Sequence, residues 1–161
     1  MTSKIFTALG MAAISAAALS LSTSSAQAQD GKVDFAKQIL PIFEEHCFDC
    51  HQAPFYDDTG RLKKPKGGLR MDNPELLIEG GEGTNENGDD GGVALNPGNK
   101  DKSTIYTMMK LHEDEDMAMP SKGDRVPDDQ IELVGKWINE GASFGDWKGA
   151  PKEVTPTPPA E

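Results

Sequence analysis

Five consecutive residues, Cys47-Phe48-Asp49-Cys50-His51, constrain this chain more than any other feature of its sequence. Two thiols separated by two residues and followed directly by an imidazole form the pattern to which haem c is covalently attached. On one helical turn both sulfurs project from the same side, so both can form thioethers with one porphyrin, while His51 comes up beneath the iron. The sequence therefore predicts one covalent haem c, held by Cys47, Cys50 and His51.

Two other interpretations of a Cys-x-x-Cys pair fit this sequence less well. A thioredoxin-like redox site needs a strand-helix-strand setting, which the residues around Cys47 do not offer. A zinc site needs ligands that surround the metal tetrahedrally, whereas His46, Cys47, Cys50 and His51 are packed together and no second Cys or His pair follows them. Both cysteines of the chain lie in this one motif, so no disulfide framework is expected.

The second axial position of the iron can hold a thioether or a second imidazole, or it can be vacant. The candidates after the motif are Met71, Met108, Met109, His112, Met117 and Met119. The first three methionines lie where apolar core residues are expected. Met117 and Met119 lie in an irregular stretch, where a spacing of two sends them to opposite sides, and Pro120 stiffens the loop after Met119. We therefore expect Met119 as the distal ligand, with Met117 and His112 as alternatives.

The beginning of the chain has the pattern of a cleavable export signal. One positive charge in residues 1–4 precedes an apolar run rich in Ala and Leu over 5–21, and a Ser-rich stretch then closes with Ala26-Gln27-Ala28. The run is short and interrupted by polar residues, which disfavours a membrane span. We expect a secretory signal peptide over residues 1–28, cleaved after Ala28, and hence a periplasmic or otherwise exported protein without a membrane span.

Cleavage would leave 133 of the 161 residues, enough for one small domain after a polar lead at 29–32. The net charge of −11 becomes −12 when Lys4 is removed, so a nucleic-acid partner is not expected. With 6% aromatic residues, 17 Gly and 11 Pro, the polypeptide offers little packing material. Burying about 400 Å² of porphyrin at roughly 25 cal/mol per Å² would contribute about 10 kcal/mol, so we expect the haem-free chain to be largely unfolded.

Local patterns predict four helical segments. An irregular start over 33–40 is expected to lead into a helix from about Pro41 to the cysteine motif. Asn73-Pro74-Glu75 begins a short helix, which Gly80-Gly81 ends. Ser103 is expected to cap a third helix that runs through residue 111. The apolar stripe of a fourth helix, over 128–140, consists of Ile131, Val134, Trp137 and Ile138.

The segments between these helices are expected to be loops. The loop over 54–70 carries five cations, Arg61, Lys63, Lys64, Lys66 and Arg70. They form either a docking site for an acidic redox partner, a counterion for haem propionates or a solvated surface. The Gly-rich, acidic stretch 79–99 should hold no packed element, and its resemblance to a calcium loop fails where carboxylates are required. Residues 145–161 are expected to form a Pro-rich disordered tail.

These residues resemble the planctomycete-type cytochrome c domain, which is itself similar to small class I c-type cytochromes. The matching stretches are 33–36, 39–42, 47–51, 66–72, 96–99, 102–103, 119–120, 129–131 and 137–142. The Gly-Gly-Leu-Arg sequence at 67–70 is the most family-specific of them. The resemblance covers residues 33–144 and implies an all-α, cytochrome c-like single domain in which the first and last helices cross. It also implies that His51 and Met119 ligate iron from opposite faces.

We therefore expect an exported monohaem cytochrome that carries single electrons between redox proteins, with no enzymatic activity of its own. A peroxidase-like or gas-binding haem protein is the alternative, and it requires an open or weakly ligated distal position with a polar catalytic side chain.

Overall fold

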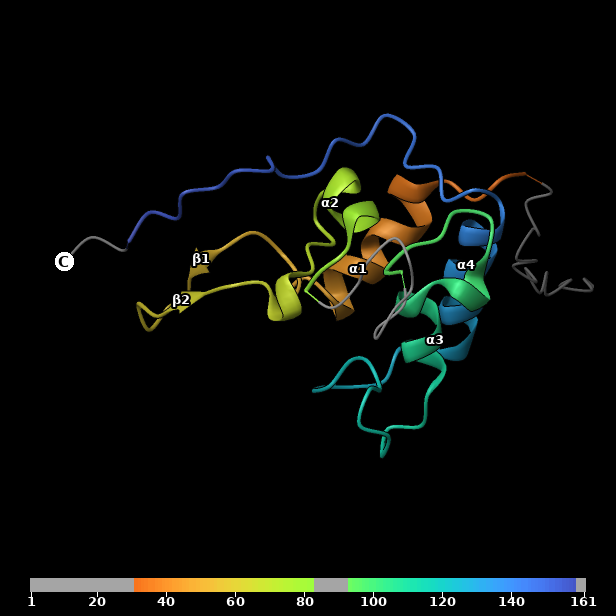
Figure 1. Cartoon of the computed structure of the whole chain (residues 1–161), viewed down its shortest axis with the longest axis horizontal. Coiled ribbons are helices and arrows are strands. Elements are labelled where there is room, and N and C mark those ends of the chain that lie inside the picture. The colour runs from red at the N-terminus through yellow and green to blue at the C-terminus, as the bar shows by residue number, and fades with distance from the viewer. Residues whose placement is uncertain (1–30, 83–92, 159–161) are drawn as a thin grey trace, which may run out of the picture. The chain divides into compact units, whose positions relative to one another are not determined.

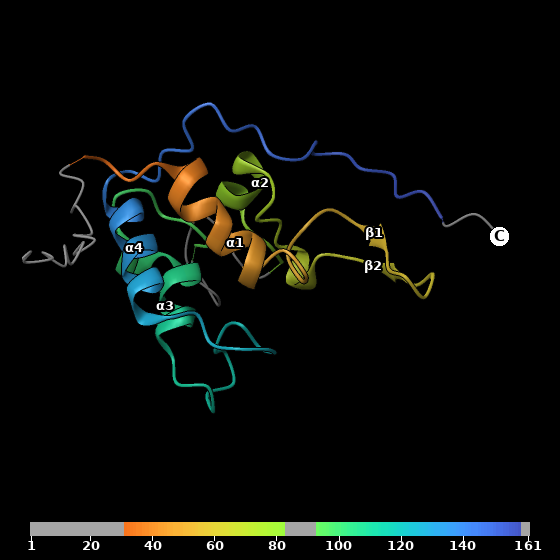
Figure 2. The same ribbon diagram turned by 180° about the vertical axis from the view of Figure 1, so that it is seen from behind.

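The structure, a computed structural model, describes residues 31–82 and 93–158. Its α-helices are α1 (Leu40–His46), α2 (Pro74–Glu79), α3 (Thr104–Lys110) and α4 (Asp128–Asn139). Figure 1 shows α1 between α2 and α4, with α3 beside α4, and Figure 2 shows the same arrangement from behind. The expected signal segment 1–28 and residues 83–92 of the acidic stretch lie outside the described residues.

The first helical segment begins earlier than the sequence indicates. Phe35–Ile39 forms a π-helical turn that continues directly into α1, where an irregular start was expected. The carboxylate of Asp34 caps this turn by accepting a hydrogen bond from the backbone N–H of Lys37 at 3.1 Å. The π-helical turn ends two residues before Pro41. Proline has no N–H, so it cannot continue a regular hydrogen-bond ladder there.

Helix α4 provides the centre of the apolar core. The stripe expected from the sequence is confirmed, since Ile131, Val134, Trp137 and Ile138 are each at most 1% exposed. The ring of Trp137 lies 5.2 Å from that of Phe35 and 6.0 Å from that of Phe43, measured between centroids. The first and last helical segments therefore pack against each other through aromatic side chains.

Helix α2 confirms its sequence signals, whereas α3 departs from them. Asn73 caps α2 by accepting a hydrogen bond from the backbone N–H of Leu76 at 2.9 Å. Ser103 occupies the N-cap position of α3, as expected, but its side chain makes no capping hydrogen bond. Its fully buried hydroxyl accepts a hydrogen bond from the N–H of Asn96 and donates one to the carbonyl of Asn99. The expected position of Ser103 is therefore confirmed, but capping by its hydroxyl is wrong, because this hydroxyl instead closes the turn that precedes α3.

The turn over 96–99 also brings part of the supposed loop into the core. Ala94 and Leu95 are each 1% exposed, and the Ala94 carbonyl accepts a hydrogen bond from Ile105 at 3.2 Å. The described residues 80–82 and 93–99 hold no helix or strand, as expected, but these two side chains are buried. The sequence did not indicate their burial, because Gly, Asn and Asp dominate the local composition.

A small sheet corrects the expected all-α class. Strands β1 (Phe55–Tyr56) and β2 (Leu62–Lys63) pair antiparallel, and the hairpin extends away from the helices in Figure 1. The Asp57 carboxylate holds the turn by accepting hydrogen bonds from Thr59 and from the N–H of Arg61. These bonds, led by the Thr59 hydroxyl, hold the pKa of Asp57 well below its usual range. Strands of two residues are too short to show an alternating pattern in the sequence.

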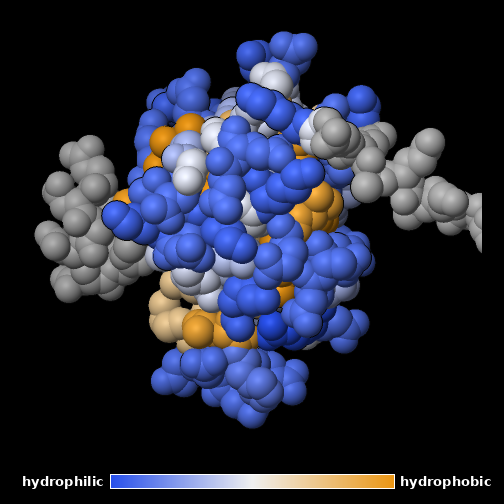
Figure 3. Space-filling view, turned by 90° about the vertical axis from the view of Figure 1, so that its right-hand side faces the viewer, coloured by the Kyte–Doolittle hydropathy of each residue, from blue (hydrophilic) through white to orange (hydrophobic). Residues whose placement is uncertain are grey.

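The outer surface is mostly hydrophilic. The face in Figure 3 is largely blue, with small orange areas between the polar side chains. Large apolar side chains that remain exposed in the described residues include Leu62, Ile78 and Met117. No helix of the described part has the length and apolar character that crossing a bilayer requires.

Candidate haem-binding site

The turn that follows α1 brings the two cysteines and His51 together. The N–H of Cys47 donates to the Phe43 carbonyl at 2.9 Å, and the N–H of His51 donates to the Cys47 carbonyl at 2.9 Å. The N–H of Cys50 donates to the same Cys47 carbonyl at 3.1 Å. These bonds keep the backbone wound through the motif, so two half-buried free thiols and one imidazole leave a single turn.

Burial shifts the pKa values of Cys47 and His51. It raises the pKa of the Cys47 thiol to about 12, with a smaller contribution from Cys50. Burial also lowers the pKa of His51, although the backbone of Leu69 and of Lys66 opposes this shift. The imidazole is therefore neutral near pH 7, which is the form that ligates a metal. The Cys47 thiol therefore remains protonated near pH 7.

The residues of this turn fit a covalently attached haem. The Nδ1 atom of His51 is buried and has no hydrogen-bond partner among the described residues. A buried imidazole nitrogen in this state is costly unless it gains a ligand. Two free thiols that can form thioethers, with a neutral imidazole directly after the second, are also the side chains that attachment of haem c requires.

The segment 66–72 lies against the motif and satisfies its backbone. The N–H of Lys66 donates to the Cys50 carbonyl, and the N–H of Met71 donates to the His51 carbonyl, both at 2.8 Å. Gly67 and Gly68 have φ values of +57° and +66°, a conformation that glycine adopts without strain. The Gly-Gly-Leu-Arg sequence therefore turns the chain so that it returns alongside His51.

The three distal-ligand candidates differ in exposure. Met119 is half-buried, and its N–H donates to the Met108 carbonyl of α3 at 3.1 Å. Met117 is 54% exposed, and the side chain of His112 is 69% exposed beside Asp114. Met119 is thus the least exposed of the three. The contacts that the structure shows tie it to α3 and not directly to the Cys47–His51 turn.

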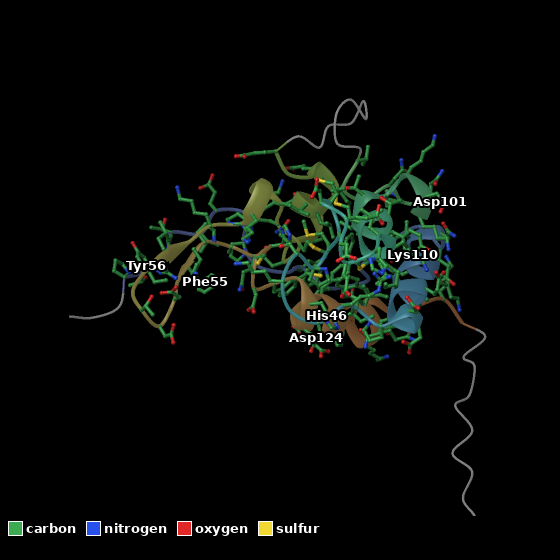
Figure 4. All side chains as sticks on the ribbon, turned by 90° about the horizontal axis from the view of Figure 1, so that it is seen from below. His46, Phe55, Tyr56, Asp101, Lys110 and Asp124 are labelled. Carbon is green, nitrogen blue, oxygen red and sulfur yellow. The ribbon has the colours of Figure 1, made fainter. Side chains whose placement is uncertain are left out.

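Two of the three methionines expected in the core are buried. Met71 and Met109 are each 4% exposed, and Met108 is half-buried. Figure 4, with sulfur in yellow, shows several sulfur atoms in the middle of the molecule, whereas Phe55 and Tyr56 lie on the outlying hairpin.

Arg70 is wrongly placed by the sequence analysis among the docking cations. It is only 6% exposed, and its Nε and Nη2 atoms donate to the two carboxylate oxygens of Asp72 at 2.9 Å each. A buried guanidinium engaged in this way presents no charge to a partner. Opposite charges at positions i and i+2 of extended backbone share one face, and this spacing was the signal for the pair.

The other four cations of the loop also differ among themselves. The Nε atom of Arg61 lies 3.6 Å, and the Nζ atom of Lys63 lies 3.3 Å, from a carboxylate oxygen of Asp57. Lys64 and Lys66 are exposed, and no ion pair involves either of them in the described part of the chain. The charge of Lys66 is near enough to His51 to lower its pKa further. The unpaired positive charge therefore lies beside the motif.

The C-terminal residues make contacts that the sequence did not indicate. Ala150 and Asp72 are joined by a backbone hydrogen bond of 2.7 Å, and the ring of Trp147 lies 4.8 Å from that of Phe35. Residues 147–152 therefore contact the domain, which was expected to end at residue 144 and to be followed by a disordered tail. Proline content predicts an extended backbone but does not show where that backbone finds hydrogen-bond partners.

Comparison with known proteins identifies one family. Residues 47–123 match the family model described as Planctomycete cytochrome C. The match includes the cysteine motif, the 66–72 segment, α2, α3 and Met119. No curated protein and no solved structure matches the chain.

Proposed function

Because residues 47–123 match the family model of planctomycete-type cytochrome c domains, we propose that this protein is a monohaem c-type cytochrome that carries single electrons between redox partners. The observation that carries the proposal is the Cys47–His51 turn, which combines two free thiols with a buried, neutral imidazole. When bound, haem c supplies an iron centre that changes its oxidation state by one electron.

Four residues would hold the haem. Cys47 and Cys50 would hold the porphyrin through thioethers, and His51 would be the proximal ligand of the iron. Met119 would be the distal ligand, which its low exposure among the candidates and the stiffening effect of Pro120 support. If His51 and Met119 stayed bound to the iron in both oxidation states, its coordination would change little on electron transfer. No coordination position would then remain for a substrate.

The test of this function is the intact mass and visible spectrum of the full chain. We expect a bacterial host with cytochrome maturation machinery to export a chain that begins at Gln29 and carries the mass of one haem. The reduced protein should show the sharp bands of a six-coordinate c-type cytochrome. The same chain from a host without this machinery is the control and should be colourless. A bare processed chain from the competent host would exclude the proposal.

Substitution of Met119 with alanine should expose the iron. We expect the Met119→Ala protein to lose the weak sulfur-to-iron absorption band of the ferric state and to have a lower reduction potential, because a thioether ligand raises it. The ferrous protein should also bind carbon monoxide rapidly. Met117→Ala is the matched control, since this methionine is 54% exposed and should leave both properties unchanged. If the two variants exchange these behaviours, Met117 is the ligand.

We further propose that Lys64 and Lys66 guide an acidic redox partner to the motif. Both are exposed in a strongly acidic protein, and the N–H of Lys66 bonds directly to the Cys50 carbonyl. Reversing both charges to glutamate should slow oxidation of the reduced protein by the anion ferricyanide roughly tenfold at low ionic strength. The difference should shrink as salt is added.

The control for this experiment separates local charge from net charge. Lys102 and Lys122 are also exposed, and reversing them changes the net charge by the same amount. We expect this second double variant to keep most of the original oxidation rate. Equal slowing in the two proteins would show that only the total charge matters, and the docking proposal would then be withdrawn.

A further inference from the structure

A buried ion pair lies between the haem motif and the C-terminal residues. Arg70 and Asp72 are each 6% exposed, and their two hydrogen bonds measure 2.9 Å. Burying two charges is costly unless the remaining donors and acceptors are also satisfied. The hydrogen bonds that satisfy these donors and acceptors join the pair to two separate parts of the chain.

On one side, the pair binds the backbone that follows the iron-ligand histidine. The Oδ2 atom of Asp72 accepts a hydrogen bond from the N–H of Ala53 at 2.9 Å. The N–H of the intervening residue, Met71, donates to the His51 carbonyl at 2.8 Å. The peptide groups of His51 and Ala53 are thus held by two neighbouring residues of the 70–72 segment.

On the other side, the pair binds the C-terminal segment. The Nη1 atom of Arg70 donates to the Lys152 carbonyl at 2.6 Å, and Nη2 donates to the Pro151 carbonyl at 3.0 Å. The backbone N–H of Ala150 donates to the Asp72 carbonyl at 2.7 Å. Three consecutive residues near the end of the chain therefore bond to the same buried pair.

Two neighbouring contacts keep this segment in register. Asn73 donates from Nδ2 to the Ala150 carbonyl at 2.7 Å. At Gly149, which has a φ of +64°, an added Cβ would lie 2.2 Å from the Asp72 carbonyl oxygen. Only glycine permits this close backbone approach. The contacts involve main-chain atoms on both segments, so they define a specific arrangement.

We propose that residues 149–152 act as a strap that fixes the backbone at His51 and Ala53 through the buried Arg70–Asp72 pair. Arg70 and Asp72 are then positioning residues for the iron ligand, a role that rests on the proposed function of His51. The guanidinium suits this position because its planar fork can donate to a carboxylate and to two carbonyls at once. A lysine would keep the charge but lose this geometry.

The test compares amide hydrogen exchange in the full-length, haem-loaded protein with that in three variants. Arg70→Lys removes the fork, a stop after Lys148 removes the strap, and Gly149→Ala obstructs its approach. We expect each to speed exchange at the Ala53 amide by about tenfold or more, which corresponds to about 1.4 kcal/mol of local opening. The electron paramagnetic resonance signal of the ferric haem should also shift, because the orientation of the His51 ligand is less restricted.

Controls distinguish this local effect from general loss of stability. A stop after Pro156 keeps every contact of the strap and should leave the Ala53 exchange rate and the resonance signal unchanged. The Trp137 amide of α4 should exchange at its original rate in all proteins. Unchanged exchange at Ala53 in the stop after Lys148, or equal acceleration at Trp137, would overturn the strap. If any variant does not fold, the other two decide the question.

Failure of the proposed function would be recognised separately. If the unaltered chain carries no haem, the role of His51 is excluded, but the exchange rates at Ala53 still report whether the strap holds the backbone. If haem is bound in all four proteins and exchange at Ala53 does not change, the strap is excluded while the cytochrome function stands.

Discussion

Replacing Cys47 and Cys50 together with alanine should give a chain that carries no covalent haem and shows no cooperative thermal unfolding. The reason lies in the size of the contribution that the porphyrin makes. About 400 Å² of buried porphyrin surface corresponds to about 10 kcal/mol, whereas the net stability of a domain is roughly 5–15 kcal/mol. Loss of this surface would therefore remove most of the stability of the domain.

The arrangement of the core supports this expectation. Fully buried apolar side chains gather around α4 and the Phe35–Ile39 turn. On the side of the motif, Cys47, Phe48 and Leu69 are only partly buried, and the backbone is held by hydrogen bonds to the 66–72 segment. Hydrogen bonds each contribute only about 1 kcal/mol, so they do not replace a large buried surface.

The measurement is circular dichroism as a function of temperature, in the aromatic and the backbone regions. The unaltered sequence produced without haem is the matched control, and it should behave like the double variant. The haem-loaded protein should unfold in one sharp transition. A sharp transition in the haem-free double variant would contradict the prediction and would show that the polypeptide core suffices.

The second large effect is expected for Trp137→Ala in the haem-loaded protein. Trp137 is 1% exposed, and its ring contacts Phe35, Phe43 and Phe144 at centroid distances of 5.2, 6.0 and 5.3 Å. Its Nε1 atom donates to the Ser143 carbonyl at 2.9 Å. Removing the ring leaves a cavity and an unsatisfied carbonyl, so we expect a loss of about 3–5 kcal/mol in the free energy of unfolding.

Urea unfolding measures this loss, and Trp147→Ala is the matched control. The Trp147 ring also contacts Phe35 and Phe144, but the residue is half-buried. We expect its removal to cost less than about 2 kcal/mol, mainly through lost aromatic contacts. The midpoint should fall in both variants without a change in the slope of the transition. Equal losses in the two variants would mean that Trp137 is not the centre of the core.

Local signals in the sequence were sufficient for much of the fold. The start of α2 was predicted because Asn73 and Pro74 act within the first turn of the helix, and the structure confirms it. Helix α4 was predicted because its four apolar residues recur at helical spacing, and all four are buried. The family assignment followed from short stretches of this kind, and the family match over 47–123 confirms it.

The errors concern contacts that no local pattern in the sequence indicates. Arg70 was counted as a surface cation because its carbonyl partners, Pro151 and Lys152, lie 81 and 82 residues further along the chain. Ser103 was taken as a helix cap because nothing in its immediate neighbours shows that the Asn96–Asn99 turn folds back onto it. The hairpin was missed because its strands are two residues long.

The sequence by itself therefore determined the family that residues 47–123 match and the positions of the strongest helices. Cysteine spacing, helix caps and apolar periodicity act over one or two turns, and such short-range physical effects can be recognised in the order of residues. Only the tertiary structure decided which charges are buried, which hydroxyl closes a turn, and where the C-terminal segment binds. Those outcomes depend on hydrogen-bond partners that only the folded chain brings together. Burial of a polar group costs free energy unless the group gains such a partner.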